Sequence, residues 1–345
     1  MFFLKEKYKN GNAYLSDAIY MRASKNYLCK KNKKFETEWE IVNNNIFDIK
    51  SISDNILVGS FSELAYIKER RYYKNQMYLM HKNTGEIFGN EIPFEFLYGE
   101  NNTIYCLERT ENCMIFTKGQ LMDNKYIIEQ KTNLPFMGFW ELIGDNFFYI
   151  PFDIMVQNQI IAIDIHTGEE NWHFHTSKLG KGDQPVKIIY GVYQEILVVN
   201  IGKWHIVGIN TQTGKIEWNI DLGYLGLVPN STNDILYSLI SSRYTGGHFL
   251  EINPCTGEMV KYGIEKSKVL LASQRKDFIL VGTHIITTDD RDGKIGAFNI
   301  LTHEFDWIWE EEGTSFYGQM KYFDPYLFVQ NKDNTLYVFE KEKNN

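Results

Sequence analysis

The chain has 345 residues, of which 43% are hydrophobic and 15% aromatic, and its formal net charge is −8. This composition excludes a disordered chain and a small disulfide-stapled fold, because enough apolar surface is present for a large core. Acidic and basic residues are interspersed, which argues against nucleic acid or a membrane surface as the partner.

The first residues, "MFFLKEKYKNGNAYL", reach a charged side chain at position 5 and contain no apolar signal core. No apolar run elsewhere approaches the roughly 18 residues of a membrane helix. The four cysteines have no CxxC spacing, which is typical of buried free thiols in a reducing compartment. We therefore expect a cytoplasmic protein without disulfides.

A short apolar run preceded by Asp, Asn or Glu recurs eight times in the chain. The first begins at residue 17 and the last at residue 324, which gives an average step of about 44 residues, the period of four-stranded propeller blades. Each run is rich in β-branched and aromatic residues and is predicted to form a buried strand. In chain order the runs are DAIYM, NILVG, NTIYC, NFFYI, EILVV, DILYS, DFILV and DPYLF.

In the best-preserved repeats a Thr-Gly turn follows the next strand, and a tryptophan lies four residues after the glycine. The glycine supplies the positive φ that the turn needs, and the tryptophan is expected to bury its ring against the adjoining blade. The same spacing identifies a tryptophan in two weaker repeats, one of which has His303 in place of the glycine. The expected blade-docking residues are Trp39, Gly168, Trp172, Gly214, Trp218 and Trp307.

The segments "AIDIHTGEENW" and "GINTQTGKIEW" resemble the docking motif of the pyrroloquinoline-quinone-type, or quinoprotein-like, β-propeller repeats. This family includes quinoprotein dehydrogenases and an outer-membrane assembly lipoprotein. The resemblance implies an all-β propeller of four-stranded antiparallel blades that forms one domain over residues 1–345, because a lone blade cannot cover both of its faces.

The last repeat supplies only three strands before the chain stops. Residues 1–8, "MFFLKEKY", precede the first repeat and are predicted to add the missing outer strand of an eighth blade, which would close the ring and cover a sheet edge. Seven blades are the alternative, if the weakest repeat, around residues 102–131, is an insertion.

Catalytic signatures are not found in the sequence. The enzymes of the family that it resembles need a quinone and a calcium ion, and the adjacent cysteine pair that marks their site does not occur here. There is also no GxSxG, phosphate-binding glycine loop or HExxH. His173 and His175 would point to one side of a strand, but no third metal ligand is identifiable. We expect no catalytic residues, no cofactor and no metal.

Loops between the second and third strands of propeller blades emerge on one face, and several of them are long here. The longest is expected from Ser60 to Gln76. Arg, Tyr and Trp are frequent interface anchors, although a solvated loop or a plain hairpin extension is the alternative for any one of them. The candidate partner-binding residues are Arg70, Arg71, Tyr72, Tyr73, Lys203, Trp204, Arg243 and Tyr244.

These observations favour a monomeric, non-catalytic cytoplasmic binding or scaffold protein that recognises another protein through loops on one propeller face. One specific version is a bacterial immunity protein that neutralises an intercellular toxin. The alternative is an enzyme or a carbohydrate-binding module that uses the central channel, since a propeller fold by itself does not define an activity.

Overall fold

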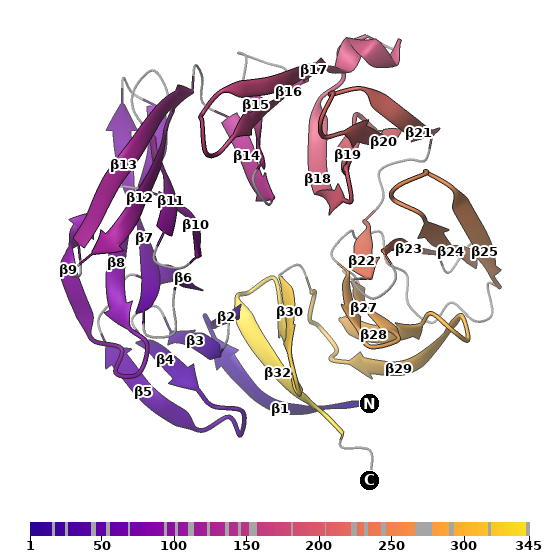
Figure 1. Ribbon diagram of the computed structural model, residues 1–345. Coiled ribbons are helices and arrows are strands. Elements are labelled where there is room, and N and C mark those ends of the chain that lie inside the picture. The colour runs from indigo at the N-terminus through magenta and orange to yellow at the C-terminus, as the bar shows by residue number, and fades with distance from the viewer. Residues whose placement is uncertain are drawn as a thin grey trace.

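The computed structural model of the chain is a ring of eight four-stranded antiparallel sheets, the blades (Figure 1). Within blades 1 to 7 the strands follow one another in chain order from the centre of the ring outward, and in blade 8 the first strand of the chain is the outermost. No helix in the described part of the chain is long and apolar enough to cross a membrane. The structure describes residues 1–15, 18–24, 27–42, 46–52, 56–67, 70–92, 95–100, 103–109, 114–122, 125–134, 138–143, 146–151, 157–180, 182–203, 205–221, 226–230, 234–242, 246–265, 278–289, 293–316 and 319–342.

The blades are numbered in chain order. Blade 1 comprises β2 (Asn12–Leu15), β3 (Ile19–Ser24), β4 (Tyr27–Lys31) and β5 (Thr37–Val42), and blade 2 comprises β6 (Ile46–Ser51), β7 (Ile56–Ile67), β8 (Arg70–His81) and β9 (Ile87–Ile92). Blade 3 comprises β10 (Glu95–Glu100), β11 (Thr103–Arg109), β12 (Met114–Met122) and β13 (Lys125–Leu134), and blade 4 comprises β14 (Gly138–Ile143), β15 (Asn146–Pro151), β16 (Gln159–Asp164) and β17 (Glu170–His175).

The second half of the ring repeats this arrangement. Blade 5 follows the short 3-10 helix η1 (Thr176–Leu179) and comprises β18 (Val186–Tyr193), β19 (Ile196–Ile201), β20 (His205–Asn210) and β21 (Ile216–Asp221). Blade 6 comprises β22 (Val228–Asn230), β23 (Ile235–Ser242), β24 (Gly246–Ile252) and β25 (Met259–Ile264). Blade 7 comprises β26 (Ile279–Val281), β27 (His284–Asp289), β28 (Lys294–Asn299) and β29 (Glu304–Glu310), and blade 8 comprises β30 (Met320–Phe323), β31 (Tyr326–Gln330), β32 (Thr335–Lys341) and β1 (Phe2–Lys9).

Blade 8 joins the two ends of the chain. β1 pairs antiparallel with β32, from Phe2 opposite Lys341 to Lys9 opposite Thr335, and the termini lie next to each other in Figure 1. The predictions of eight blades and of closure by the N-terminal strand are therefore confirmed. The seven-blade alternative is wrong, because the weakest repeat forms the complete blade 3.

Burial along the strands explains the repeated apolar runs. All six residues of β19 are buried, because a middle strand packs against a neighbouring blade on both of its faces. The outer strand β21 instead alternates exposed residues with buried or half-buried ones. A short continuous apolar run is the expected signature of a strand covered on both sides.

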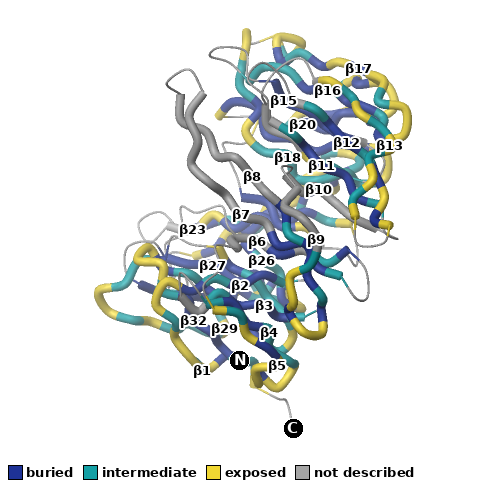
Figure 2. Tube along the Cα trace, turned by 90° about the vertical axis from the view of Figure 1, so that its left-hand side faces the viewer, coloured by how far each residue is buried: buried dark blue, intermediate teal, exposed yellow. Residues whose placement is uncertain are grey.

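The core is divided among the blade junctions. The buried hydrophobic residues that the structure describes form eight clusters, each of which joins two neighbouring blades. Figure 2 shows the consequence: buried segments run through the blades, and exposed segments gather at the turns and outer strands. Each blade is therefore stabilised by its neighbours rather than by a core of its own.

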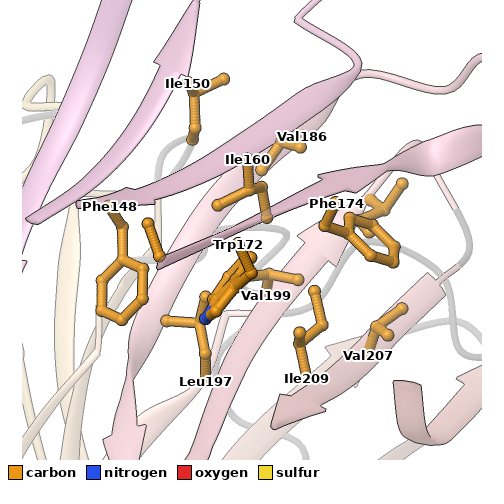
Figure 3. Packing of buried hydrophobic residues seen from close by; sticks show 12 residues of the cluster. Phe148, Ile150, Ile160, Trp172, Phe174, Val186, Leu197, Val199, Val207 and Ile209 are labelled. Atoms are coloured by element: carbon orange, nitrogen blue, oxygen red, sulfur yellow. The ribbon is translucent and has the colours of Figure 1, made fainter. Parts of the chain in front are cut away.

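Tryptophans connect successive blades through one recurring contact. The ring of Trp172 lies among residues of blades 4 and 5 (Figure 3), and its Nε1 donates a hydrogen bond of 2.5 Å to the carbonyl of Thr211 in the blade 5 turn. Trp39 and Trp218 likewise donate to carbonyls of the next blade's turn, at 2.9 Å and 3.0 Å. A buried indole thus has its N–H satisfied across each of these junctions.

The turn glycine belongs to the same contact. A Cβ added to Gly214 would come within 2.9 Å of the Trp172 ring, and one added to Gly257 within 2.7 Å of Trp218. Both glycines also have positive φ, at 64° and 74°. Each glycine therefore accommodates the tryptophan of the preceding repeat, so the Gly and Trp of one repeat face different junctions.

Other junctions depart from this pattern. Thr132 of blade 3 lies where a Cβ of Gly168 would project. Trp307 is half-buried and contacts the rings of Phe2 and Phe339 in blade 8, at centroid distances of 5.6 Å and 5.9 Å. At the junction between blades 8 and 1, Phe35 occupies the glycine position of the turn with a φ of 68°.

Candidate functional site

The two ends of the ring carry different connections. We call the end with the connections between second and third strands the ribbon face, after the extension formed there by β7 and β8. The opposite end, which carries the turns between third and fourth strands, including Gly168 and Gly214, is called the turn face. The described candidates, Arg70, Arg71, Tyr72, Tyr73 and Lys203, belong to connections or strand ends on the ribbon face.

The segment expected to be a loop from Ser60 to Gln76 is an antiparallel ribbon. β7 and β8 remain paired from Ile56 opposite His81 to Ile67 opposite Arg70. Their neighbours stop earlier, because the pairing of β6 ends at Phe61 and that of β9 at Met77. The six pairs from Ser62 opposite Asn75 onward therefore lie beyond the described backbone pairing of β6 and β9, and they extend the hairpin by about 20 Å at ~3.3 Å per residue.

The four candidates of this segment lie at the far end of the ribbon. Arg70, Arg71, Tyr72 and Tyr73 pair along the backbone with Ile67, Tyr66, Ala65 and Leu64. Their side chains lie outside the described part of the structure. The backbone shows that these residues are carried away from the four-stranded sheet by a ladder of paired strands.

The other candidates lie at a distance around the ring. Lys203 is exposed in the turn between β19 and β20 of blade 5, whereas Trp204, Arg243 and Tyr244 fall outside the described residues. Arg243 and Tyr244 belong to the connection between β23 and β24, in blade 6. Of the described candidates, Lys203 in blade 5 and the ribbon residues of blade 2 share one face of the ring without forming one cluster.

The turn that carries Lys203 is held by polar contacts beneath it. The side chain of Asn200 donates to the carbonyl of His205 at 3.0 Å, and Gly202 adopts a φ of 63°. His205 is buried, and its Nδ1 lies 2.7 Å from a carboxylate oxygen of Asp221. This paired histidine fixes the hairpin base and presents Lys203 to solvent.

The two histidines of β17 that were considered as metal ligands each contact a different protein side chain. His173 contacts the side chain of Gln159 at 3.1 Å, and Nδ1 of His175 lies 2.7 Å from the Ser177 hydroxyl. Within the described residues no three His, Cys, Asp or Glu side chains converge as metal ligands would.

The turn face carries a pocket that the search for motifs did not identify. It is an open depression of about 440 Å³ beside the β4–β5 turn of blade 1, and its walls include Lys30, Lys31, Lys33 and Lys34. Phe323 at the end of β30 contributes an apolar surface from blade 8. The run "KKNKK" was visible in the sequence, but the approach of Phe323 across almost the whole chain length was not. We refer to this feature as the basic pocket.

No protein-family model matches the chain, and no curated protein matches it in sequence. Solved structures do share its backbone path. BamB from Moraxella catarrhalis is 13% identical, with a TM-score of 0.57, over 99% of this chain and 100% of its own. Sqt1 from Saccharomyces cerevisiae is 9% identical, with a TM-score of 0.62, over 99% and 98%.

A third solved structure extends the likeness to an artificial protein. The computationally designed Ika8 protein is 11% identical, with a TM-score of 0.58, and the match covers 95% of this chain and 94% of that one. At such identities the likeness concerns the fold alone. Together with the strand order, it shows that this chain is an eight-bladed β-propeller.

Proposed function

We propose that this protein is a non-catalytic binding protein that recognises another protein through its ribbon face. The observation that carries the proposal is the β7–β8 ribbon, in which six residue pairs extend beyond the pairing of β6 and β9. In the described backbone ladders these six pairs lie beyond the pairing of β6 and β9, so blade formation does not account for them.

The composition of the ribbon supports a protein partner. Its tip reads "KERRYYK" over residues 68–74, a basic and aromatic segment in a chain of net charge −8. Tyrosine offers a large contact area with few rotatable bonds, and arginine can pair bidentately with a carboxylate. An acidic protein surface would complement this segment, and binding would then weaken as salt is added.

The ribbon can be removed with little effect on its blade. Phe61 and Gln76 are opposite each other in the ladder, so residues 62–75 can be replaced by Asn-Gly, which forms a two-residue hairpin turn. We expect the shortened protein to melt at nearly the same temperature as the original. Used as bait in native lysate, it should lose a partner that the full chain recovers, and equal recovery by both would contradict the proposal.

A double substitution tests the anchors within the ribbon. Arg71→Ala together with Tyr73→Ala should weaken partner binding by roughly 2 kcal/mol, the usual threshold for an interface hot spot. Surface substitutions of this kind change stability by little, so the melting temperature serves as the control. Titration calorimetry against the captured partner measures the effect, and unchanged affinity would remove these two residues from the interface.

The more specific form of the proposal is an immunity protein that acts in the cytoplasm by neutralising a toxin. The lack of catalytic motifs and the individual character of the ribbon support it. Expressed alone, the captured partner should then arrest growth, and co-expression with this chain should restore it. Restored growth that persists with the shortened ribbon would contradict toxin capture by this element.

A further inference from the structure

The basic pocket lies at the junction between the first and last blades, on the face opposite the ribbon. Its volume of about 440 Å³ falls within the range of pockets that take small molecules, about 300–1,000 Å³. Ala18 and Phe323 supply apolar surface, and four lysines line the remainder together with polar residues of the β4–β5 turn. The lining therefore combines an apolar wall with concentrated positive charge.

The lining holds four lysines and two carboxylates, so positive charge predominates in it. Glu38 pairs with Lys30 at 2.7 Å, and Glu36 accepts a hydrogen bond of 2.9 Å from the side chain of Asn32. Lys33 and Lys34 are exposed, and neither forms an ion pair with a described carboxylate. The positive charge at the tip of the turn is thus left for an external anion.

The turn that carries these lysines is held in one conformation. The Oδ1 of Asn32 accepts hydrogen bonds from the backbone N–H groups of Lys34, at 2.9 Å, and of Glu36, at 3.0 Å. The Tyr326 hydroxyl donates to the carbonyl of Lys33 at 3.2 Å. Phe35 is buried with its ring centroid 4.9 Å from that of Tyr326. A backbone fixed at this many points lowers the ordering cost of binding at its tip.

The corresponding turns of other blades lack this cluster of charge. Between the Asn that begins the turn and the turn glycine, blade 5 reads "TQT" and blade 6 reads "PCT", while blade 1 reads "KK" between Asn32 and Phe35. In all three turns the Asn Oδ1 accepts a hydrogen bond from the backbone N–H two residues later. Its second donor is the N–H three residues later in blades 5 and 6 and four residues later in blade 1. The lysines are therefore not needed to build the turn.

We propose that the basic pocket binds a small organic dianion, either a phosphate or a pair of carboxylates attached to an apolar body. The anionic group lies between the ammonium groups of Lys33 and Lys34, since lysine binds phosphate as a point charge. The apolar body lies against Phe323. This site is independent of the ribbon, and its occupant leaves the ribbon face free.

Calorimetric titration of the full chain tests the site with three probes. Phenyl phosphate and phthalate each carry a dianionic group on a ring, and inorganic phosphate has no ring. At least one aromatic dianion should bind saturably at one equivalent per chain, and the better of the two identifies the anionic group. The better aromatic probe should bind at least about fivefold more tightly than inorganic phosphate, because contact between its ring and the apolar wall adds affinity. Absence of saturable binding by both, or equal binding of inorganic phosphate, would overturn the proposal.

A matched pair of charge reversals separates the pocket from general electrostatic attraction. Lys34→Glu should weaken the better aromatic probe by about tenfold or more, and Lys33→Glu provides the same test if the first variant fails to fold. Lys215→Glu changes the charge equally at an exposed lysine of the blade 5 turn, and it should leave affinity within about twofold, since screening limits distant charges. Equal losses in both variants would overturn a defined site.

Discussion

Two blade junctions are each filled by a large aromatic ring, but the ring comes from opposite sides. They are the junction between blades 4 and 5 and the junction between blades 8 and 1. In the first, Trp172 on the outer strand of the earlier blade covers Gly214 in the turn of the later one. In the second, the turn residue is Phe35, which reaches back onto Tyr326 of the earlier blade. The earlier blade therefore contributes the ring at the first junction, and the later blade contributes it at the second.

The difference follows from how the ring closes. The outer strand of blade 8 is β1, which pairs with β32 although the two strands lie at opposite ends of the sequence. Its Lys5 lies near the rings of Phe35 and Tyr326, with Nζ 5.8 Å and 5.3 Å from their centroids, and pairs with Glu340 at 2.7 Å. A cation over aromatic rings replaces the indole at this position.

Of the changes considered, removal of β1 should lower the stability of the protein most. Deletion of residues 1–8 takes away the buried Phe2 and exposes the edge of β32. Truncating one buried phenylalanine already costs about 3–5 kcal/mol, and the strand pairing is lost as well. We expect a large fall in the melting temperature by calorimetry, and a truncated chain that melts like the full one would mean that β1 does not close the ring.

Loss of an indole should weaken a regular junction. Trp172→Ala and Trp218→Ala are each expected to lower the free energy of unfolding by about 3–5 kcal/mol, because both rings are buried and hydrogen-bonded to the next blade. Chemical denaturation measures the change. Trp307→Ala serves as a comparison at a half-buried position and should cost less, whereas equal costs at all three positions would contradict the role assigned to the turn contact.

A methyl group at the turn glycine should test how closely the indole approaches. Gly214→Ala incurs about 1–2 kcal/mol from positive φ, and it also forces the Trp172 ring to move. Gly180→Ala has a similar φ of 73°, with no atom within 4 Å of the added Cβ, so it isolates the backbone cost. We expect Gly214→Ala to be the more destabilising in thermal denaturation, and similar losses would mean that the ring yields freely.

Two substitutions of Phe35, in the strained turn of blade 1, should differ from each other in stability by a smaller amount. Phe35→Ala removes the ring and keeps a Cβ at a φ of 68°, whereas Phe35→Gly removes the ring and relieves the backbone. The glycine variant should therefore be more stable than the alanine variant by about 1 kcal/mol. Paired denaturation curves provide the measurement, and a less stable glycine variant would contradict a strained backbone at Phe35.

The repeats could be predicted from sequence because the middle strands are covered on both faces. Runs such as "EILVV" are apolar throughout for that reason, and their spacing defines the blades. Phe35 could not be predicted as a turn residue, since a bulky residue at positive φ is rare and is tolerated only where tertiary contacts fix it. Its contact with Tyr326 spans almost the whole sequence.

The candidate sites were predicted less completely. Local composition identified the segment that contains Arg71 and Tyr73. Its charged residues are typical of a loop, however, and the sequence did not indicate that β7 and β8 stay paired along their whole length. The basic pocket requires Phe323 to lie beside the lysine turn of blade 1. That neighbourhood exists only after the ring has closed, so no local pattern could predict it.

The central claim is that the ribbon face, and not the turn face, recognises a partner protein. The most direct measurement is photo-crosslinking from p-benzoylphenylalanine placed at Tyr73 in the ribbon or at Lys215 in the exposed blade 5 turn. In native lysate, the probe at position 73 should give a defined covalent adduct with the partner, and the probe at position 215 should give none. An adduct from position 215 alone, or the same adduct from both positions, would contradict the account.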